Sequence, residues 1–87
     1  MAQFRKKPVV IEAILFTGKN QSEALGFCRP RLSKAAREGA QEMGLPVIIP
    51  TPEGEMRADP GDWIIKGVKG EFYPCKPDIF AATYDAV

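Results

Sequence analysis

The chain has 87 residues, with twelve basic and eleven acidic side chains and a formal net charge of +1. We expect residues 1–87 to form a single domain, because this length supports only one modest core. An apolar fraction of 45% is typical of a folded protein rather than a disordered one. A net charge this close to zero gives no long-range electrostatic attraction to DNA, RNA or anionic lipid. The composition therefore disfavours a nucleic-acid-binding protein.

Histidine is absent, and there are only two cysteines, Cys28 and Cys75. The sequence therefore lacks the commonest general base and the commonest ligand of transition metals. Two cysteines alone cannot complete a structural zinc site. Lys76 could lower the pKa of the neighbouring Cys75 thiol, but without a histidine base we interpret this thiol as structural. We expect a protein without catalytic residues, without metal and without cofactors.

The N-terminal residues lack the pattern of a secretion signal, and no apolar run is long enough to span a bilayer. The sequence thus predicts a cytoplasmic protein with reduced thiols and no membrane partner. A disulfide between Cys28 and Cys75 is the less favoured alternative.

The segment from Val9 to Phe16 is predicted to be a strand. Its alternate residues from Val9 to Leu15 are apolar, and Glu12 is the only charged residue of the other face. A strand that is covered on both faces has this pattern. We therefore expect it at or near the centre of the sheet.

A first helix is expected after residue 20. Asn20 and Glu23 have the spacing of a capping box, in which the asparagine side chain accepts hydrogen bonds from amides of the first turn. The helix should end near Cys28, because the residue before Pro30 disfavours helical geometry.

A second helix is predicted from Ser33, as its N-cap, to Gly44, in the left-handed conformation that ends many helices. Its small and weakly apolar faces are typical of a surface helix. We interpret the whole segment 29–45 as a variable helical insert.

Two hairpins are predicted in the second half of the chain. In the first, Val47–Thr51 and 55–58 flank a three-residue loop in which Gly54 has the left-handed conformation. Pro50 lacks an amide hydrogen and places this hairpin near a sheet edge or a bulge. In the second hairpin, two apolar runs, 63–65 and 72–73, flank a turn that contains two glycines.

A short helix, 78–84, should follow Pro77, whose missing amide hydrogen does no harm at the first helical position. The predicted fold class is α+β. It is a mostly antiparallel sheet of about five strands, built from an N-terminal strand and two C-terminal hairpins. One or two helices cover one face, and a short helix ends the chain.

One set of residues forms a chemically coherent binding hypothesis. Basic side chains would contact phosphates, and aromatic rings would stack on a base. The candidate ligand-binding residues are Lys6, Lys7, Thr51, Trp63, Lys66, Tyr73 and Lys76. The alternative is that the lysines protect sheet edges from aggregation and that Trp63 belongs to the core. We interpret the acidic residues of the turns, which include Asp59 and Asp62, as solvated turn residues.

Four segments together resemble a family of small bacteriophage and prophage proteins. These segments are Arg5-Lys6-Lys7-Pro8-Val9-Val10-Ile11-Glu12-Ala13, Ile49-Pro50-Thr51 before Glu53-Gly54, Pro60-Gly61-Asp62-Trp63-Ile64-Ile65-Lys66-Gly67, and Glu71-Phe72-Tyr73-Pro74-Cys75-Lys76-Pro77-Asp78-Ile79-Phe80. The family is named for a Pro-Gly-Asp-Tyr-Gly motif, in which Trp63 and Ile64 replace the last two residues here. The resemblance covers most of the chain outside 29–45.

The resemblance implies a phage accessory protein that acts in the host cytoplasm. Such a protein would be a non-enzymatic counter-defence protein, an inhibitor of host immunity that works by stoichiometric binding. Its partner would be either a host defence protein or a signalling nucleotide, bound by a homo-oligomer. A virion or assembly component is the alternative, and a small nucleic-acid-binding protein is a further one.

Overall fold

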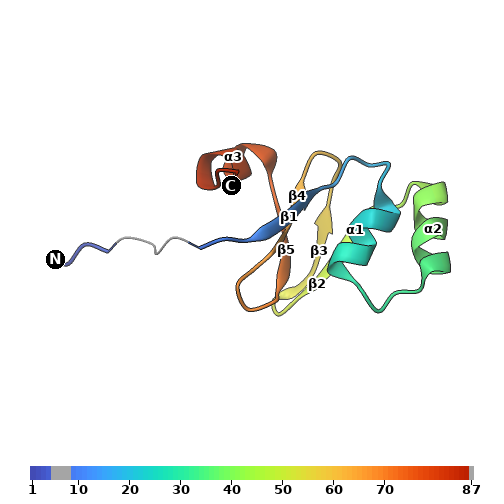
Figure 1. Cartoon of the computed structure of the whole chain (residues 1–87), viewed down its shortest axis with the longest axis horizontal. Coiled ribbons are helices and arrows are strands. Elements are labelled where there is room, and N and C mark those ends of the chain that lie inside the picture. Colours follow the sequence, from blue (N-terminus) through green and yellow to red (C-terminus); the bar gives the residue numbers. More distant parts are fainter. Residues whose placement is uncertain (5–8, 87) are drawn as a thin grey trace.

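The computed structural model describes residues 1–4 and 9–86. Within them, five strands form two antiparallel sheets and three helices pack around these sheets (Figure 1). The fold is α+β and ends with a short helix, which confirms the fold class predicted from the sequence. The strands are divided between two sheets rather than joined in one.

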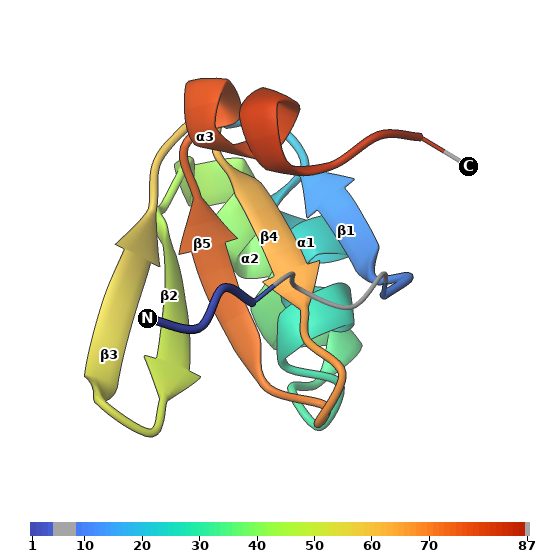
Figure 2. The same ribbon diagram turned by 90° about the vertical axis from the view of Figure 1, so that its left-hand side faces the viewer.

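The larger sheet contains β1 (Glu12–Leu15), β4 (Trp63–Lys66) and β5 (Phe72–Cys75), in the order β1-β4-β5. The central strand is β4, and β1 is a four-residue strand at the edge (Figure 2). The prediction of a central strand over residues 9–16 is therefore wrong. Apolar residues on both faces of a strand indicate that other elements cover those faces. They do not indicate which strands lie next to it in the sheet, because backbone pairing determines those neighbours.

The smaller sheet is the hairpin of β2 (Val47–Thr51) and β3 (Gly54–Ala58), which lies beside β5 (Figure 2). Thr51 pairs with Gly54, so the loop has two residues instead of the three predicted. Gly54 has a φ of +112°, which confirms its left-handed conformation.

Helix α1 (Gln21–Cys28) supplies three residues to the apolar core between the sheets and the helix. The buried members of this core are Phe16, Ala24, Leu25, Cys28, Val47, Ile49, Ala58 and Ile64. Helix α2 (Lys34–Met43) packs against α1 and has no buried residue, which confirms a surface helix. The Ser33 hydroxyl accepts a hydrogen bond from the Ala36 amide at 3.2 Å, as an N-cap does.

Asn20 precedes α1, but its side chain does not cap the helix. Its Oδ1 accepts from the Thr17 amide at 2.8 Å, and its Nδ2 donates to the Leu15 carbonyl at 2.8 Å and to Glu23 at 3.0 Å. The predicted capping box is therefore wrong in its hydrogen bonds, although the helix begins where expected. The asparagine instead ties the end of β1 to the start of α1.

The Pro-Gly-Asp motif forms the turn that leads into β4. The Asp62 amide donates to the Asp59 carbonyl at 2.9 Å, with Pro60 and a left-handed Gly61 (φ +95°) between them. This is the residue pattern of a type II turn. The Gly61 amide donates to the Phe16 carbonyl, and the Phe16 amide donates to the Asp62 carbonyl, as in a G1 bulge. The motif that carries the family resemblance therefore has a structural role.

Candidate functional site

Three aromatic rings hold α3 (Pro77–Thr83) on the larger sheet. Phe80 is stacked on Trp63, with ring centroids 4.3 Å apart and an interplanar angle of 8°. Tyr84 follows at 5.2 Å from Phe80. Because α3 itself has no buried residue, these rings are its main attachment to the sheet.

An apolar groove runs between this aromatic stack and the segment that leads into β1. Its volume is about 370 Å³. It is lined by Val9, Val10, Ile11, Ala13, Trp63, Phe80, Tyr84, Asp85 and Ala86. Val10 is 76% exposed and Val9 is 44% exposed, so the groove presents aliphatic side chains to solvent. Among the described residues, Asp85 is the only charged one in the lining.

The groove adjoins a free backbone edge. The amide and the carbonyl of Phe16 both face the β4 side. Since successive residues of a strand turn these groups to opposite sides, the groups of Ala13 and Leu15 face away from β4. Of these, the Leu15 carbonyl already accepts a hydrogen bond from Asn20 Nδ2. In the described residues no strand pairs with this side of β1. The site therefore combines an apolar groove with an open strand edge.

Lys76, a candidate phosphate ligand, is engaged within the molecule. Its Nζ lies 3.1 Å and 3.2 Å from the two carboxylate oxygens of Asp62, and 3.5 Å from Asp59. Asp62 is 3% exposed and Asp59 also pairs with Arg57 at 2.9 Å. The interpretation of Asp62 as a solvated turn acid is therefore wrong, because the turn buries its carboxylate against the lysine.

The remaining candidate residues are not gathered into one patch. Lys66 pairs with Phe72 at one end of the β4–β5 hairpin, and Lys76 follows the other end, where Trp63 pairs with Cys75. Lys6 and Lys7 lie outside the described residues. The part of the chain that the structure describes thus separates Lys66 from Lys76, and phosphate binding by these lysines stays a prediction.

Thr51 and Tyr73 do meet, in a second groove of about 410 Å³. Glu53 and Glu71 line this groove, and none of its described lining residues is basic. The Thr51 hydroxyl donates to the Gly54 carbonyl and accepts from the Glu53 amide. The groove has an acidic character, which is unfavourable for a phosphate group.

The two cysteines are free thiols. Burial raises the pKa of Cys75, and the negative charges of Asp62 and Asp78 raise it further. A thiol with a raised pKa is a poor nucleophile at neutral pH. This agrees with the structural interpretation of Cys75.

Burial raises the pKa of Tyr73 to about 12, helped by a hydrogen bond with Tyr84 and by the charge of Glu71. The ordinary value is 10.0, so the unfolded chain loses this proton first as the pH rises. The contribution of Tyr73 to stability should be complete below pH 10 and should be lost toward pH 12. We expect a pH-jump titration at 295 nm to show one tyrosine that ionises near pH 12. That phase should be absent from Tyr73→Phe, and its persistence in this variant would refute the assignment.

Comparison of the chain with protein-family models, with curated proteins and with solved structures finds no match. None of the helices in residues 9–86 has the length and apolar composition needed to cross a membrane. Over the described residues, no cluster of three or more histidine, cysteine or acidic side chains is arranged to hold a metal ion.

The binding residues predicted from the sequence include Trp63 but not Val9 and Val10, which line the same groove. Val9 and Val10 were interpreted as part of a central strand, although they precede β1 and are exposed. The available signal was the apolar run itself, which continues beyond the residues that the sheet can cover.

Proposed function

We propose that the chain is a phage-encoded, non-enzymatic counter-defence protein that blocks a host defence protein by stoichiometric binding. The partner contributes an extended apolar segment. This segment pairs with the free edge of β1 and places its side chains in the groove beside α3. The single observation that carries the proposal is the junction of the open β1 edge with exposed Val9 and Val10.

The chemistry of the site favours this class of partner. A free strand edge offers amides and carbonyls in a row, and an added strand satisfies them by main-chain hydrogen bonds. Alternate side chains of that strand then select the partner by filling the neighbouring groove. Because the groove is apolar apart from Asp85, an aliphatic or aromatic segment fits it better than an anionic ligand does.

The resemblance to small phage proteins is the other support. The resemblance to phage proteins implies a host-directed role, and a stoichiometric inhibitor needs a binding surface rather than catalytic groups. The site supports the protein-blocking form of the counter-defence role, because Lys66 and Lys76, two of the lysines proposed for a nucleotide, lie at opposite ends of the β4–β5 hairpin.

Val10→Asp should weaken partner binding without changing the fold. A charge at this position would be buried against the apolar partner segment, which should weaken binding by at least about tenfold. Val68→Asp is the matched control, since Val68 is 68% exposed and lies in the β4–β5 loop. The measurements are phage plating on defended hosts and affinity enrichment of a host protein with each variant.

Hydrogen exchange with the purified partner then tests the geometry. The amides of Ala13 and Leu15 should become protected in the complex, because they face the free edge. Equal activity of the two aspartate variants, or protection elsewhere only, would contradict the proposal. A concentration-dependent dimer that Val10→Asp dissociates would instead identify a second copy of the chain as the occupant. Recovery of the protein in purified phage particles would favour the virion alternative.

A further inference from the structure

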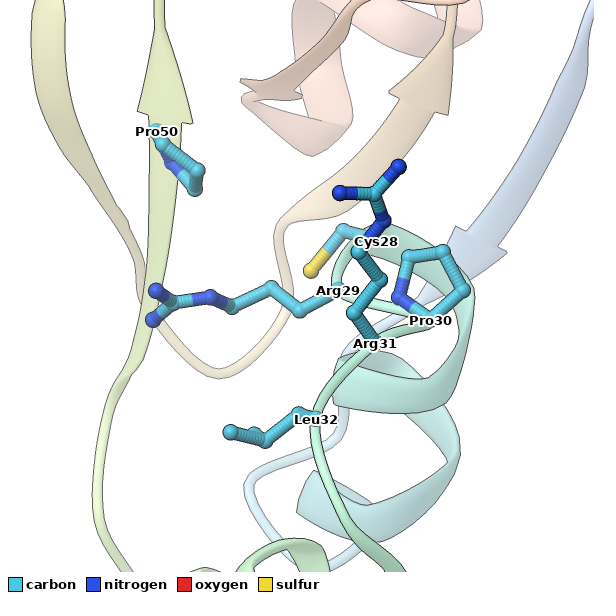
Figure 3. A pocket seen from close by; sticks show the side chains of 6 residues that line it. All are labelled: Cys28, Arg29, Pro30, Arg31, Leu32 and Pro50. Carbon is cyan, nitrogen blue, oxygen red and sulfur yellow. The ribbon is translucent and has the colours of Figure 1, made fainter.

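A second pocket lies at the junction of α1 and α2, away from the groove beside α3. Its volume is about 360 Å³, and it is lined by Cys28, Arg29, Pro30, Arg31, Leu32 and Pro50. In Figure 3, Arg29 extends from the end of α1 toward β2, and the guanidinium group of Arg31 lies on the other side of the Cys28 thiol. No acidic residue lines the pocket.

The segment that forms this pocket is unusually basic. Residues 29–37 contain three arginines and one lysine, and no acidic residue. One of these cations is paired, since Lys34 lies 3.8 Å from Glu38. The Arg37 guanidinium lies over Gly26, outside the pocket lining. Within residues 9–86, Arg29 and Arg31 form no ion pair. Arg29 and Arg31 therefore bring two unpaired positive charges to the lining of the pocket.

The backbone that carries the two arginines is held in place on both sides. The Arg29 amide donates to the Leu25 carbonyl at 2.7 Å, and the Leu32 amide donates to the Arg29 carbonyl at 3.0 Å. Pro30 fixes the backbone between them. Part of this positive charge complements the carbonyl end of α1, but a helix end carries only about half a negative charge. Most of the charge of two guanidinium groups is left for a ligand.

We propose that this pocket binds the phosphate group of a small phosphate monoester, such as a nucleoside monophosphate. Guanidinium groups bind phosphate oxygens through two parallel hydrogen bonds each, and a dianionic phosphate matches two of them. Leu32 and Pro50 form apolar walls against which the organic part of the ligand can pack. The proposal is independent of the groove beside α3, and it places phosphate recognition at arginines rather than at Lys66 and Lys76.

The test is a titration of the labelled protein with inorganic phosphate, adenosine 5′-monophosphate and adenosine, followed by amide NMR. The two phosphates should cause saturable shifts in residues 28–32 and beside Pro50. Arg29→Gln and Arg31→Gln should each weaken binding by about tenfold, and the double variant by about a hundredfold. The control is Lys19→Gln with Lys69→Gln, two exposed lysines outside the pocket, which removes the same charge elsewhere and should leave binding unchanged.

The outcomes separate specific recognition from general attraction. Tighter binding of the nucleotide than of inorganic phosphate supports contact of its organic part with the apolar walls, and equal binding supports recognition of the phosphate alone. Equal losses in the arginine and lysine double variants would overturn the proposal, as would shifts that do not saturate. Binding of adenosine as tightly as its monophosphate would overturn it as well.

Discussion

Asp62→Ala is expected to lower the free energy of unfolding by about 3 kcal/mol, the largest effect of any polar substitution considered for this chain. The carboxylate is buried, and it accepts a hydrogen bond from the Asp59 amide at 2.9 Å. The same oxygen lies 3.1 Å from the Lys76 ammonium group. Alanine would remove both interactions and leave the Asp59 amide without its acceptor.

The position of Asp62 explains why the effect should be global rather than local. It closes the turn that begins β4, and its carbonyl accepts from Phe16 in the core. Urea unfolding followed by Trp63 fluorescence measures the change. Asp85→Ala is the control, because this exposed aspartate lies after α3 and should alter stability by less than about 0.5 kcal/mol. Equal midpoints for the two variants would show that the contacts of the buried Asp62 carboxylate with Lys76 and the Asp59 amide do not stabilise the fold.

The hydrogen bond to Asp62 also raises the pKa of Lys76 above its ordinary value of 10.5. A cation with a raised folded-state pKa contributes stability that is complete below the unfolded value. That contribution is lost as the pH rises through the folded value. The ion pair should therefore be intact at neutral pH and should weaken only in strongly alkaline solution.

The features predicted correctly from the sequence are those that neighbouring residues determine. Ser33 caps α2 because a hydroxyl reaches the amide three residues later. Gly44 and Gly54 have left-handed backbones, which other residues rarely adopt. Pro77 begins α3 because its missing amide hydrogen costs nothing there.

The features that the sequence did not reveal depend on contacts between distant segments. The lysine after Cys75 looked available for a phosphate until the fold brought it against Asp62, fourteen residues earlier. The apolar pattern of residues 9–16 indicated coverage on both faces, but it contained no information on strand order. Asn20 bonds to Thr17, Leu15 and Glu23 at the same time, because the preceding loop brings these groups around its side chain.

The pocket at Arg29 and Arg31 can be predicted from the sequence more readily than the groove beside α3. The four cations within residues 29–37 are a local signal of an anion-binding segment. The interpretation of that segment as a variable insert gave it no binding role. For the groove beside α3 the only local signal is the apolar run at Val9 and Val10, because the other walls come from β4 and the C-terminal segment, which are distant in the sequence. Its aromatic stack could be identified only once α3 was placed on the sheet.

Phe80→Ala is expected to release α3 from the sheet and to lower the free energy of unfolding by about 2 kcal/mol. A seven-residue helix is not stable on its own in water. Phe80 joins it to Trp63 through the closest ring stack in the described structure, at 4.3 Å. Loss of this ring should expose Trp63 and shift its fluorescence emission to longer wavelength. Amides of α3 should lose their protection from hydrogen exchange.

Ile79→Ala is the matched control, because Ile79 lies in the same helix and is 56% exposed. It should keep both the emission maximum and the exchange protection of the original chain. Phe80→Ala should also lose the partner, since the groove needs α3 in place, whereas Val10→Asp should weaken partner binding at full stability. If Phe80→Ala kept partner binding while α3 exchanged freely, the aromatic wall would not belong to the binding site, and the β1 edge alone would carry the interaction.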